Sequence, residues 1–197
     1  MLLHRPALSV AIVLMAALMS TAGLARAGDT KAPRKSGAAV AIDAFYGDWR
    51  GTALAESEDS LYFALTQRDV SVSVTPVKAP KGGFSLSWST VQRKKGDPVD
   101  PVEEVKETAV TFEPGERPNL WWDVKRGDPA SGETLRWARI DGRTLIINTV
   151  TMRRDGSLES QTYRRTLTGK GMALSFSRVL DGKEVRSVSG QLTKQAQ

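Results

Sequence analysis

The sequence predicts an all-β protein: an antiparallel up-and-down meander of about ten strands that closes into a barrel, with a sandwich as the alternative. Two observations carry this prediction. Apolar and polar residues alternate in residues 70–75 (VSVSVT) and 84–89 (FSLSWS), which is typical of strands with one face on a core and one in water. Asp141-Gly142, Asp155-Gly156 and Asp181-Gly182 lie between strand-like runs, and each is a strong hairpin signal.

The expected strands follow one another through mostly short connections. Helical spacing is almost absent after residue 27, and only Asp100–Lys106 could form a short turn of helix. The approximate strand ranges are 47–54, 61–66, 69–76, 83–92, 104–112, 119–125, 133–140, 143–152, 158–167, 171–180 and 184–193.

The first 27 residues are typical of a secretory signal peptide. Arg5 supplies the positive charge, residues 6–19 the apolar segment, and Ala25-Arg26-Ala27 an A-x-A cleavage site. The apolar run is too short to span a bilayer core of about 30 Å as a helix. We therefore expect an exported protein of the periplasm or extracellular space, not integrated in a membrane. Residues 28–43 are expected to be a flexible lead-in, and residues 44–197 a single barrel domain.

Composition excludes several kinds of site. The chain has no cysteine, and its one histidine, His4, lies in the segment expected to be removed. The mature protein would then have no disulfide, no Cys/His metal site and no Ser-His-Asp triad. Loss of Arg5 and Arg26 lowers the net charge from +6 to +4, and the remaining basic residues are interspersed with acids rather than concentrated as in a nucleic-acid-binding face. We expect no metal, no cofactor and no nucleic-acid partner.

The segment Gly47-Asp48-Trp49-Arg50-Gly51 opens the first expected strand. This Gly-x-Trp-x-Gly motif, together with the meander, resembles the calycins: lipocalins, fatty-acid-binding proteins and nitrobindin-like barrels. The resemblance implies structural roles for Gly47 and Trp49, with Trp49 closing one barrel end and Arg178 or Arg186 packing across it. The lipocalin disulfide and the haem-ligating histidine of nitrobindin-like proteins are both absent here. In the alternative interpretation, Gly47 merely opens a strand and Trp49 is an ordinary core residue.

Counting outward from two-residue turns at the four C-terminal hairpins predicts which residues share a face. One face would carry two neighbouring rows: Trp137, Ile146, Arg165, Leu174 and Ser189, and then Leu135, Asn148, Tyr163, Phe176 and Ser187. This face is the richer in aromatic residues, so we expect it to line the interior. A mostly apolar cavity with a few polar groups is typical of small-molecule sites, and an inward arginine suits an anionic group. The candidate ligand-binding residues are Arg165, Tyr163, Asn148, Trp137 and Phe176. In the alternative, Arg165 pairs with a carboxylate such as Asp123 or reaches solvent at a barrel end.

Three functions are consistent with these patterns. We favour a non-enzymatic exported barrel that binds a small apolar or anionic molecule. The alternative is an envelope structural or interaction protein with a filled barrel, using the residues 93–118 and Trp121-Trp122, whose side chains must point to opposite faces of a strand. A hydrolase with paired carboxylates is the third, but the glutamates cluster in or beside charged loops and neither Ser-x-x-Lys nor Gly-x-Ser-x-Gly occurs. No catalytic residue is assigned. An open interior would favour binding over interaction.

Overall fold

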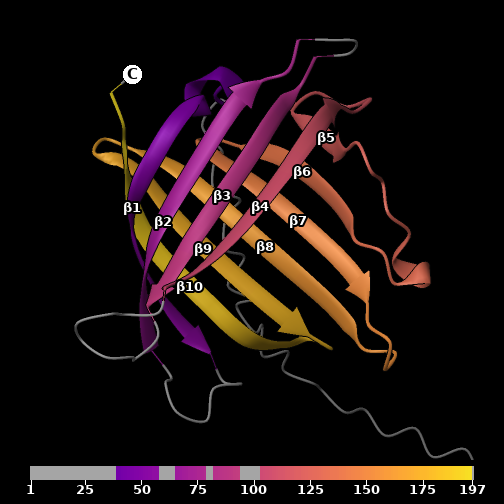
Figure 1. Cartoon of the computed structure of the whole chain (residues 1–197). Helices are drawn as coiled ribbons and strands as arrows, with labels where there is room; N and C mark the ends of the chain where they lie inside the picture. The colour runs from indigo at the N-terminus through magenta and orange to yellow at the C-terminus, as the bar shows by residue number, and fades with distance from the viewer. Residues whose placement is uncertain (1–38, 58–64, 79–81, 94–102, 197) are drawn as a thin grey trace, which may run out of the picture. The chain divides into compact units, whose positions relative to one another are not determined.

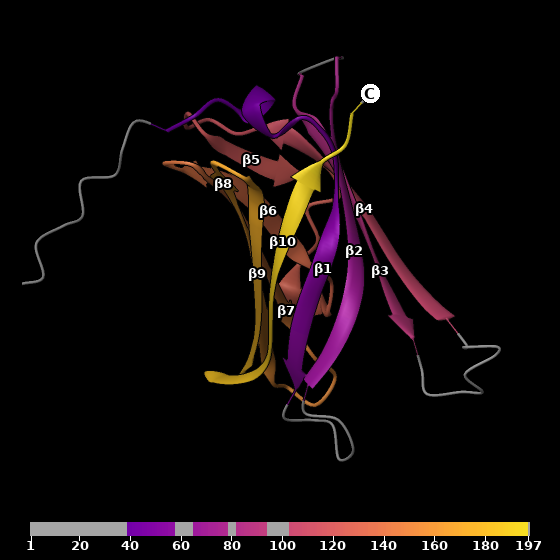
Figure 2. The same ribbon diagram turned by 90° about the vertical axis from the view of Figure 1, so that its left-hand side faces the viewer.

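The computed structural model describes residues 39–57, 65–78, 82–93 and 103–196. These residues form a closed barrel of ten antiparallel strands, in which each strand lies beside its neighbours in sequence and β1 pairs with β10 (Figures 1 and 2). The predicted all-β meander and its closure are confirmed, and the sandwich alternative is wrong. The strands are β1 (Gly47–Ser57), β2 (Leu65–Pro76), β3 (Phe84–Arg93), β4 (Glu103–Pro114), β5 (Leu120–Asp123), β6 (Leu135–Asp141), β7 (Thr144–Met152), β8 (Leu158–Thr168), β9 (Gly171–Leu180) and β10 (Lys183–Lys194), with 3-10 turns η1 (Ile42–Phe45) and η2 (Pro129–Ser131).

Some of the expected segments lie outside the described residues, and others differ from the structure at their ends. The expected signal peptide, residues 1–27, lies outside the described residues, and so does most of the expected strand at 61–66. The helical turn considered at residues 100–106 is wrong from Glu103 onward, where the chain is already strand. Val40 N–H donates to Gly142 O (2.9 Å), so the barrel domain makes contacts before its expected start at residue 44. In the part of the chain that the structure describes, no helix is long and apolar enough to cross a membrane.

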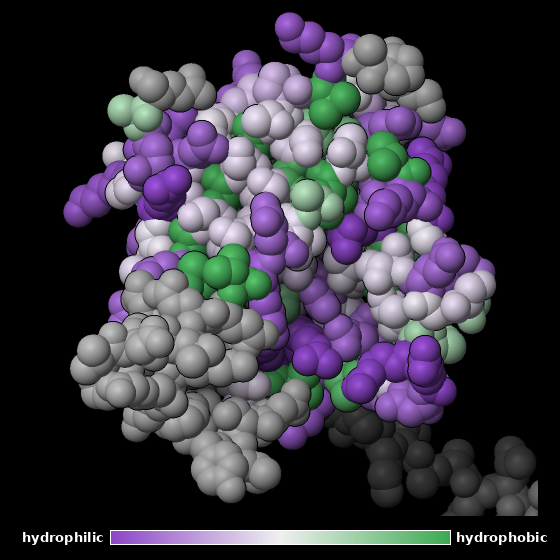
Figure 3. Space-filling model, in the orientation of Figure 1, coloured by the Kyte–Doolittle hydropathy of each residue, from purple (hydrophilic) through white to green (hydrophobic). Residues whose placement is uncertain are grey.

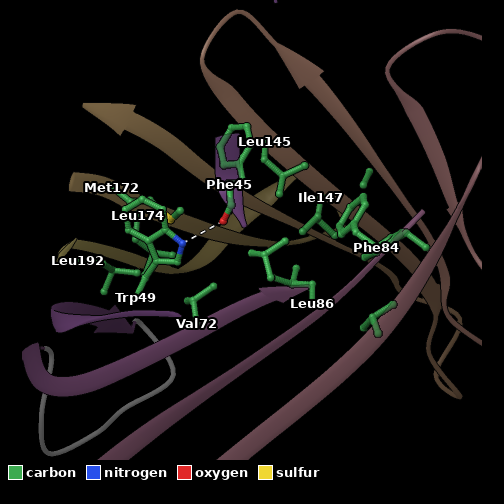
Figure 4. Close-up of a cluster of buried hydrophobic side chains, with 14 of the residues drawn as sticks. Phe45, Trp49, Val72, Phe84, Leu86, Leu145, Ile147, Met172, Leu174 and Leu192 are labelled. Atoms are coloured by element: carbon green, nitrogen blue, oxygen red, sulfur yellow. Dashed lines mark hydrogen bonds between the residues drawn. The ribbon is translucent and has the colours of Figure 1, made fainter. Parts of the chain in front are cut away.

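The apolar core fills one end of the barrel. It lies where β1, β3 and β9 start and where β2, β4 and β10 end, and Figure 4 shows its side chains converging there. The alternation of the sequence produces this packing, because every second residue of a strand points to the same face. Val70, Val72 and Val74 are buried on β2, as are Phe84 and Leu86 on β3.

Trp49 is buried in this end of the barrel. Its indole Nε1–H donates to the carbonyl oxygen of Phe45 (3.0 Å), a residue of η1 that is itself fully buried (Figure 4). The ammonium nitrogen of Lys194 stands 5.4 Å from the centroid of the Trp49 ring. The expectation that Arg178 or Arg186 packs across the tryptophan is therefore wrong. The cation over this ring comes from the last strand, which pairs directly with β1.

Two glycines allow β1 and β10 to approach closely. A Cβ atom on Gly51 would lie 1.9 Å from the carbonyl oxygen of Gln191, and one on Gly190 would lie 2.6 Å from that of Thr52. No side chain larger than hydrogen fits at either distance. The second glycine of the Gly-x-Trp-x-Gly motif is thus explained by barrel closure. The first, Gly47, has a φ of +118°, a backbone conformation that favours glycine.

Strand β5 forms the fewest backbone pairs with its neighbours in the barrel wall. This strand has four residues and pairs with β4 only over Phe112–Pro114, and with β6 only through Leu120–Trp122. The preceding residues of β4, residues 103–110, pair with β3 alone among the described strands. Among the described strands, the shortest paired regions are therefore those of β5 with β4 and β6, and this half of β4 is paired on one side only.

Trp49→Ala should lower the free energy of unfolding by about 3–5 kcal/mol, because it removes a large buried side chain and leaves a cavity. Urea denaturation at neutral pH measures the change. Leu54→Ala is the matched control, since Leu54 lies on the same strand with its side chain exposed, and its effect should stay within about 0.5 kcal/mol. Equal effects of the two substitutions would contradict a structural role for Trp49.

Candidate functional site

A cavity of about 200 Å³ lies in the other half of the barrel interior. Figure 3 shows the molecular face drawn in Figure 1 hollowed near its centre, with hydrophilic residues around the depression. Aliphatic side chains and two threonines form part of the cavity wall. Its three aromatic residues are Trp88, Tyr163 and Phe176, and its four cationic residues are Arg68, Lys106, Arg165 and Arg186. Among the described residues, no aspartate or glutamate lines it.

Arg165 is the most deeply buried of these cations, with 1% of its surface exposed. The preceding residue of β8, Arg164, points to the opposite face of the strand, and its side chain is exposed. The guanidinium carbon lies 5.3 Å from the ring centroid of Trp88 and 5.8 Å from that of Tyr163, so aromatic faces stabilise its charge. Its Nε and Nη1 atoms are buried and have no hydrogen-bond partner among the described residues. Arg165 therefore places a positive charge inside the barrel, and two of its nitrogen atoms could still donate hydrogen bonds to a bound group.

Burial also changes the acid–base properties of Arg165. Loss of solvation lowers its pKa to about 10, because the protein interior disfavours the charged form. The guanidinium is still protonated at neutral pH. The site consequently presents a fixed positive charge to the cavity, at a cost in desolvation free energy.

Tyr163 belongs to a chain of hydrogen bonds that runs along β8. Its hydroxyl donates to Gln161 Oε1 (2.6 Å), and the Gln161 amide donates to Glu159 Oε1 (2.6 Å). Arg178 donates to the other Glu159 oxygen (3.0 Å). Burial raises the pKa of Tyr163, while the charge of Arg165 acts in the opposite direction. The tyrosine is thus a protonated donor at neutral pH, and Glu159 is paired with Arg178.

Asp123 is a second interior carboxylate, and it is paired with Arg136. The Arg136 Nη1 donates to Asp123 Oδ2 (2.7 Å), and the backbone N–H of Lys125 donates to the other oxygen. The alternative in which Asp123 neutralises Arg165 is therefore wrong. Neither Asp123 nor Glu159 lines the cavity beside Arg165.

The structure brings together three of the five candidate ligand-binding residues. Arg165, Tyr163 and Phe176 line the cavity, and the Tyr163 and Phe176 rings pack with centroids 4.6 Å apart. Trp137 and Asn148 do not line it: they pair with each other on the opposite face of the wall. There Trp137 packs on Trp122 (6.2 Å between centroids), and Asn148 accepts a hydrogen bond from Thr162. Their predicted inward direction is wrong.

The error comes from the hairpin between β7 and β8. The expected two-residue turn is a five-residue loop between the paired residues Met152 and Leu158, closed by a hydrogen bond from Arg153 N to Ser157 O. Tyr163 therefore faces Ile147 instead of Asn148. A one-residue change of register exchanges the two faces of a strand. The β8–β9 register is as predicted, with Arg165 opposite Leu174.

Sequence reasoning missed most of the cationic wall. Arg68 and Trp88 could have been found, because each continues the alternation of a buried run, Val70–Val74 on β2 and Phe84–Leu86 on β3. Arg186 could not, since a register shift between Glu184 and Arg186 changes the pairing of β10. That shift brings Val188, in place of Ser187, opposite Phe176.

The tandem tryptophans divide between the two faces as expected of a strand. Trp121 packs in the core edge-on to Phe84, whereas Trp122 lies half-buried on the outer face. The guanidinium carbon of Arg126 stands 5.7 Å from the Trp122 ring centroid. In the described residues, no group of three or more carboxylate or histidine side chains could hold a metal ion.

Comparison with known proteins does not identify a family for this chain. No protein-family model matches the chain, and no curated protein matches it. One solved structure with similarity is the S-type phycobiliprotein lyase CPES from Guillardia theta, at 11% identity and a TM-score of 0.34, covering 80% of this chain and 94% of that one.

Arg165→Met should raise the free energy of unfolding by about 1–4 kcal/mol, because an apolar side chain of similar length removes the desolvation cost of the charge. Urea denaturation at neutral pH without ligand measures this. Arg164→Met, a neighbour exposed on the outer face, should change it by at most about 0.5 kcal/mol. A strong loss of stability in Arg165→Met would instead assign Arg165 a structural role.

Proposed function

We propose that this protein binds a small molecule with an anionic group and an apolar body inside its barrel, without transforming it. The observation that carries the proposal is the buried guanidinium of Arg165, with two nitrogen donors lacking a partner among the described residues. A buried charge without a hydrogen-bonded counter-ion is costly. An anion in the cavity would accept these hydrogen bonds and remove that cost.

The remaining cavity wall supports the same ligand class. Trp88, Tyr163 and Phe176 offer aromatic surface beside Arg165, with the Trp88 and Tyr163 centroids 5.1 Å apart. The volume of about 200 Å³ is below the range of about 300–1,000 Å³ that is usual for drug-sized ligands. A compact organic acid fits this space better than a long-chain fatty acid.

An interaction protein with a filled barrel is the less favoured function, because the interior holds this cavity. The sequence of residues 1–27 supports export, and we propose that binding takes place in the periplasm or outside the cell. A soluble binding barrel in that compartment would carry or sequester its ligand.

Benzoate should bind the purified protein at least about tenfold more tightly than benzyl alcohol, because only the acid matches the buried positive charge. Isothermal titration calorimetry at neutral pH measures both affinities. Arg165→Met should weaken benzoate binding by at least about tenfold while leaving benzyl alcohol unaffected.

Arg164→Met is the control for this experiment, since it removes the same charge from the adjacent, exposed position. It should bind benzoate as the unmodified protein does. Equal affinity for the acid and the alcohol, or full benzoate binding by Arg165→Met, would overturn the proposal.

A further inference from the structure

The four cations of the cavity differ in their exposure to solvent. Arg165 is almost completely buried, Arg68 and Arg186 are half-buried, and Lys106 is exposed. One positive charge is therefore at the inner limit of the cavity, and three are nearer to water.

The strand register places these three outer cations toward the same end of the barrel. Arg68 and Lys106 lie near the starts of β2 and β4, and Arg186 lies near the start of β10, opposite Ser57 at the end of β1. Arg165 is further from that end, opposite Leu174. A molecule entering from this end would meet the outer cations first and Arg165 last.

The wall between the two levels is apolar and aromatic. Trp88 stacks beside Arg165, and Phe176 packs on Tyr163. Val188 lines the same cavity opposite Phe176. This surface suits a flat apolar body, which would separate the group bound by Arg165 from the outer end of the ligand.

A ligand with a single anionic group would occupy only one of these two positive regions. Arg68, Lys106 and Arg186 also make other interactions. All three nevertheless line the cavity, and among the described residues no acidic side chain lines it, so every charge in the described lining contributes a positive potential. A second anion would be attracted to that potential.

We propose that the ligand carries two anionic groups at opposite ends of a compact apolar or aromatic body. The inner group binds Arg165, and the outer group lies among Arg68, Lys106 and Arg186. This inference rests on the proposed function and specifies its ligand class. The outer contact should be the more sensitive to salt, since exposed charges are screened more than buried ones.

Terephthalate and its monomethyl ester form a matched pair for the test, because they share one ring and differ in one negative charge. Terephthalate should bind about five- to tenfold more tightly by calorimetry, the gain being worth an exposed ion pair or slightly more. Raising the ionic strength from about 0.05 M to about 0.5 M should reduce this preference.

The double variant Arg68→Met/Lys106→Met should lose the preference while keeping its affinity for the monoester, which reports that the inner site is intact. The control Arg164→Met/Lys170→Met removes the same net charge at exposed positions outside the cavity and should keep the preference. Equal binding of terephthalate and the monoester, or equal losses in the two double variants, would overturn the two-anion inference alone. Failure of both compounds to bind would overturn the proposed function as well.

Discussion

The whole barrel depends on the closing contact between its first and last strands. β1 and β10 pair over nine positions, from Trp49 opposite Lys194 to Ser57 opposite Arg186, and glycines on both strands make their approach sterically feasible. No disulfide can reinforce this closure, because the chain has no cysteine. Hydrogen bonds and packing between residues distant in sequence must hold it, and proteins dominated by such non-local contacts fold slowly.

The fold could be predicted from the sequence because it depends on local patterns. Alternation in residues 70–75 and 84–89 identifies strands, and most turns identify the hairpins between them. The turn at Asp181-Gly182 has the left-handed backbone expected, with φ angles of 46° and 84°. The turn predicted at Asp141-Gly142 is formed by Gly142 and Arg143 instead, because Asp141 pairs with Thr144. That change moves the register by two residues and leaves the faces unchanged.

The candidate site was less predictable because its residues depend on register over several strands. The loop after Met152 is longer than its Asp-Gly pair indicates: Asp155 accepts hydrogen bonds from the backbone and hydroxyl of Ser157, which favours a wider turn. The Asp155-Gly156 pair by itself does not separate this loop from a two-residue hairpin. Trp137 and Asn148 were consequently assigned to the wrong face, whereas Arg165 and Phe176, joined across a correctly predicted turn, were not.

The short strand β5 has a mechanical consequence for the barrel. A closed sheet resists distortion through its continuous ladder, and here the ladder is thinnest where β4 lacks a second partner over the described residues 103–110. Local opening requires least free energy where fewest hydrogen bonds and apolar contacts must break. We therefore expect local opening of the barrel to require least free energy along this half of β4. Because Lys106 and Thr108 of β4 line the cavity, such opening would widen the cationic half of the interior and leave the packing around Trp49 intact.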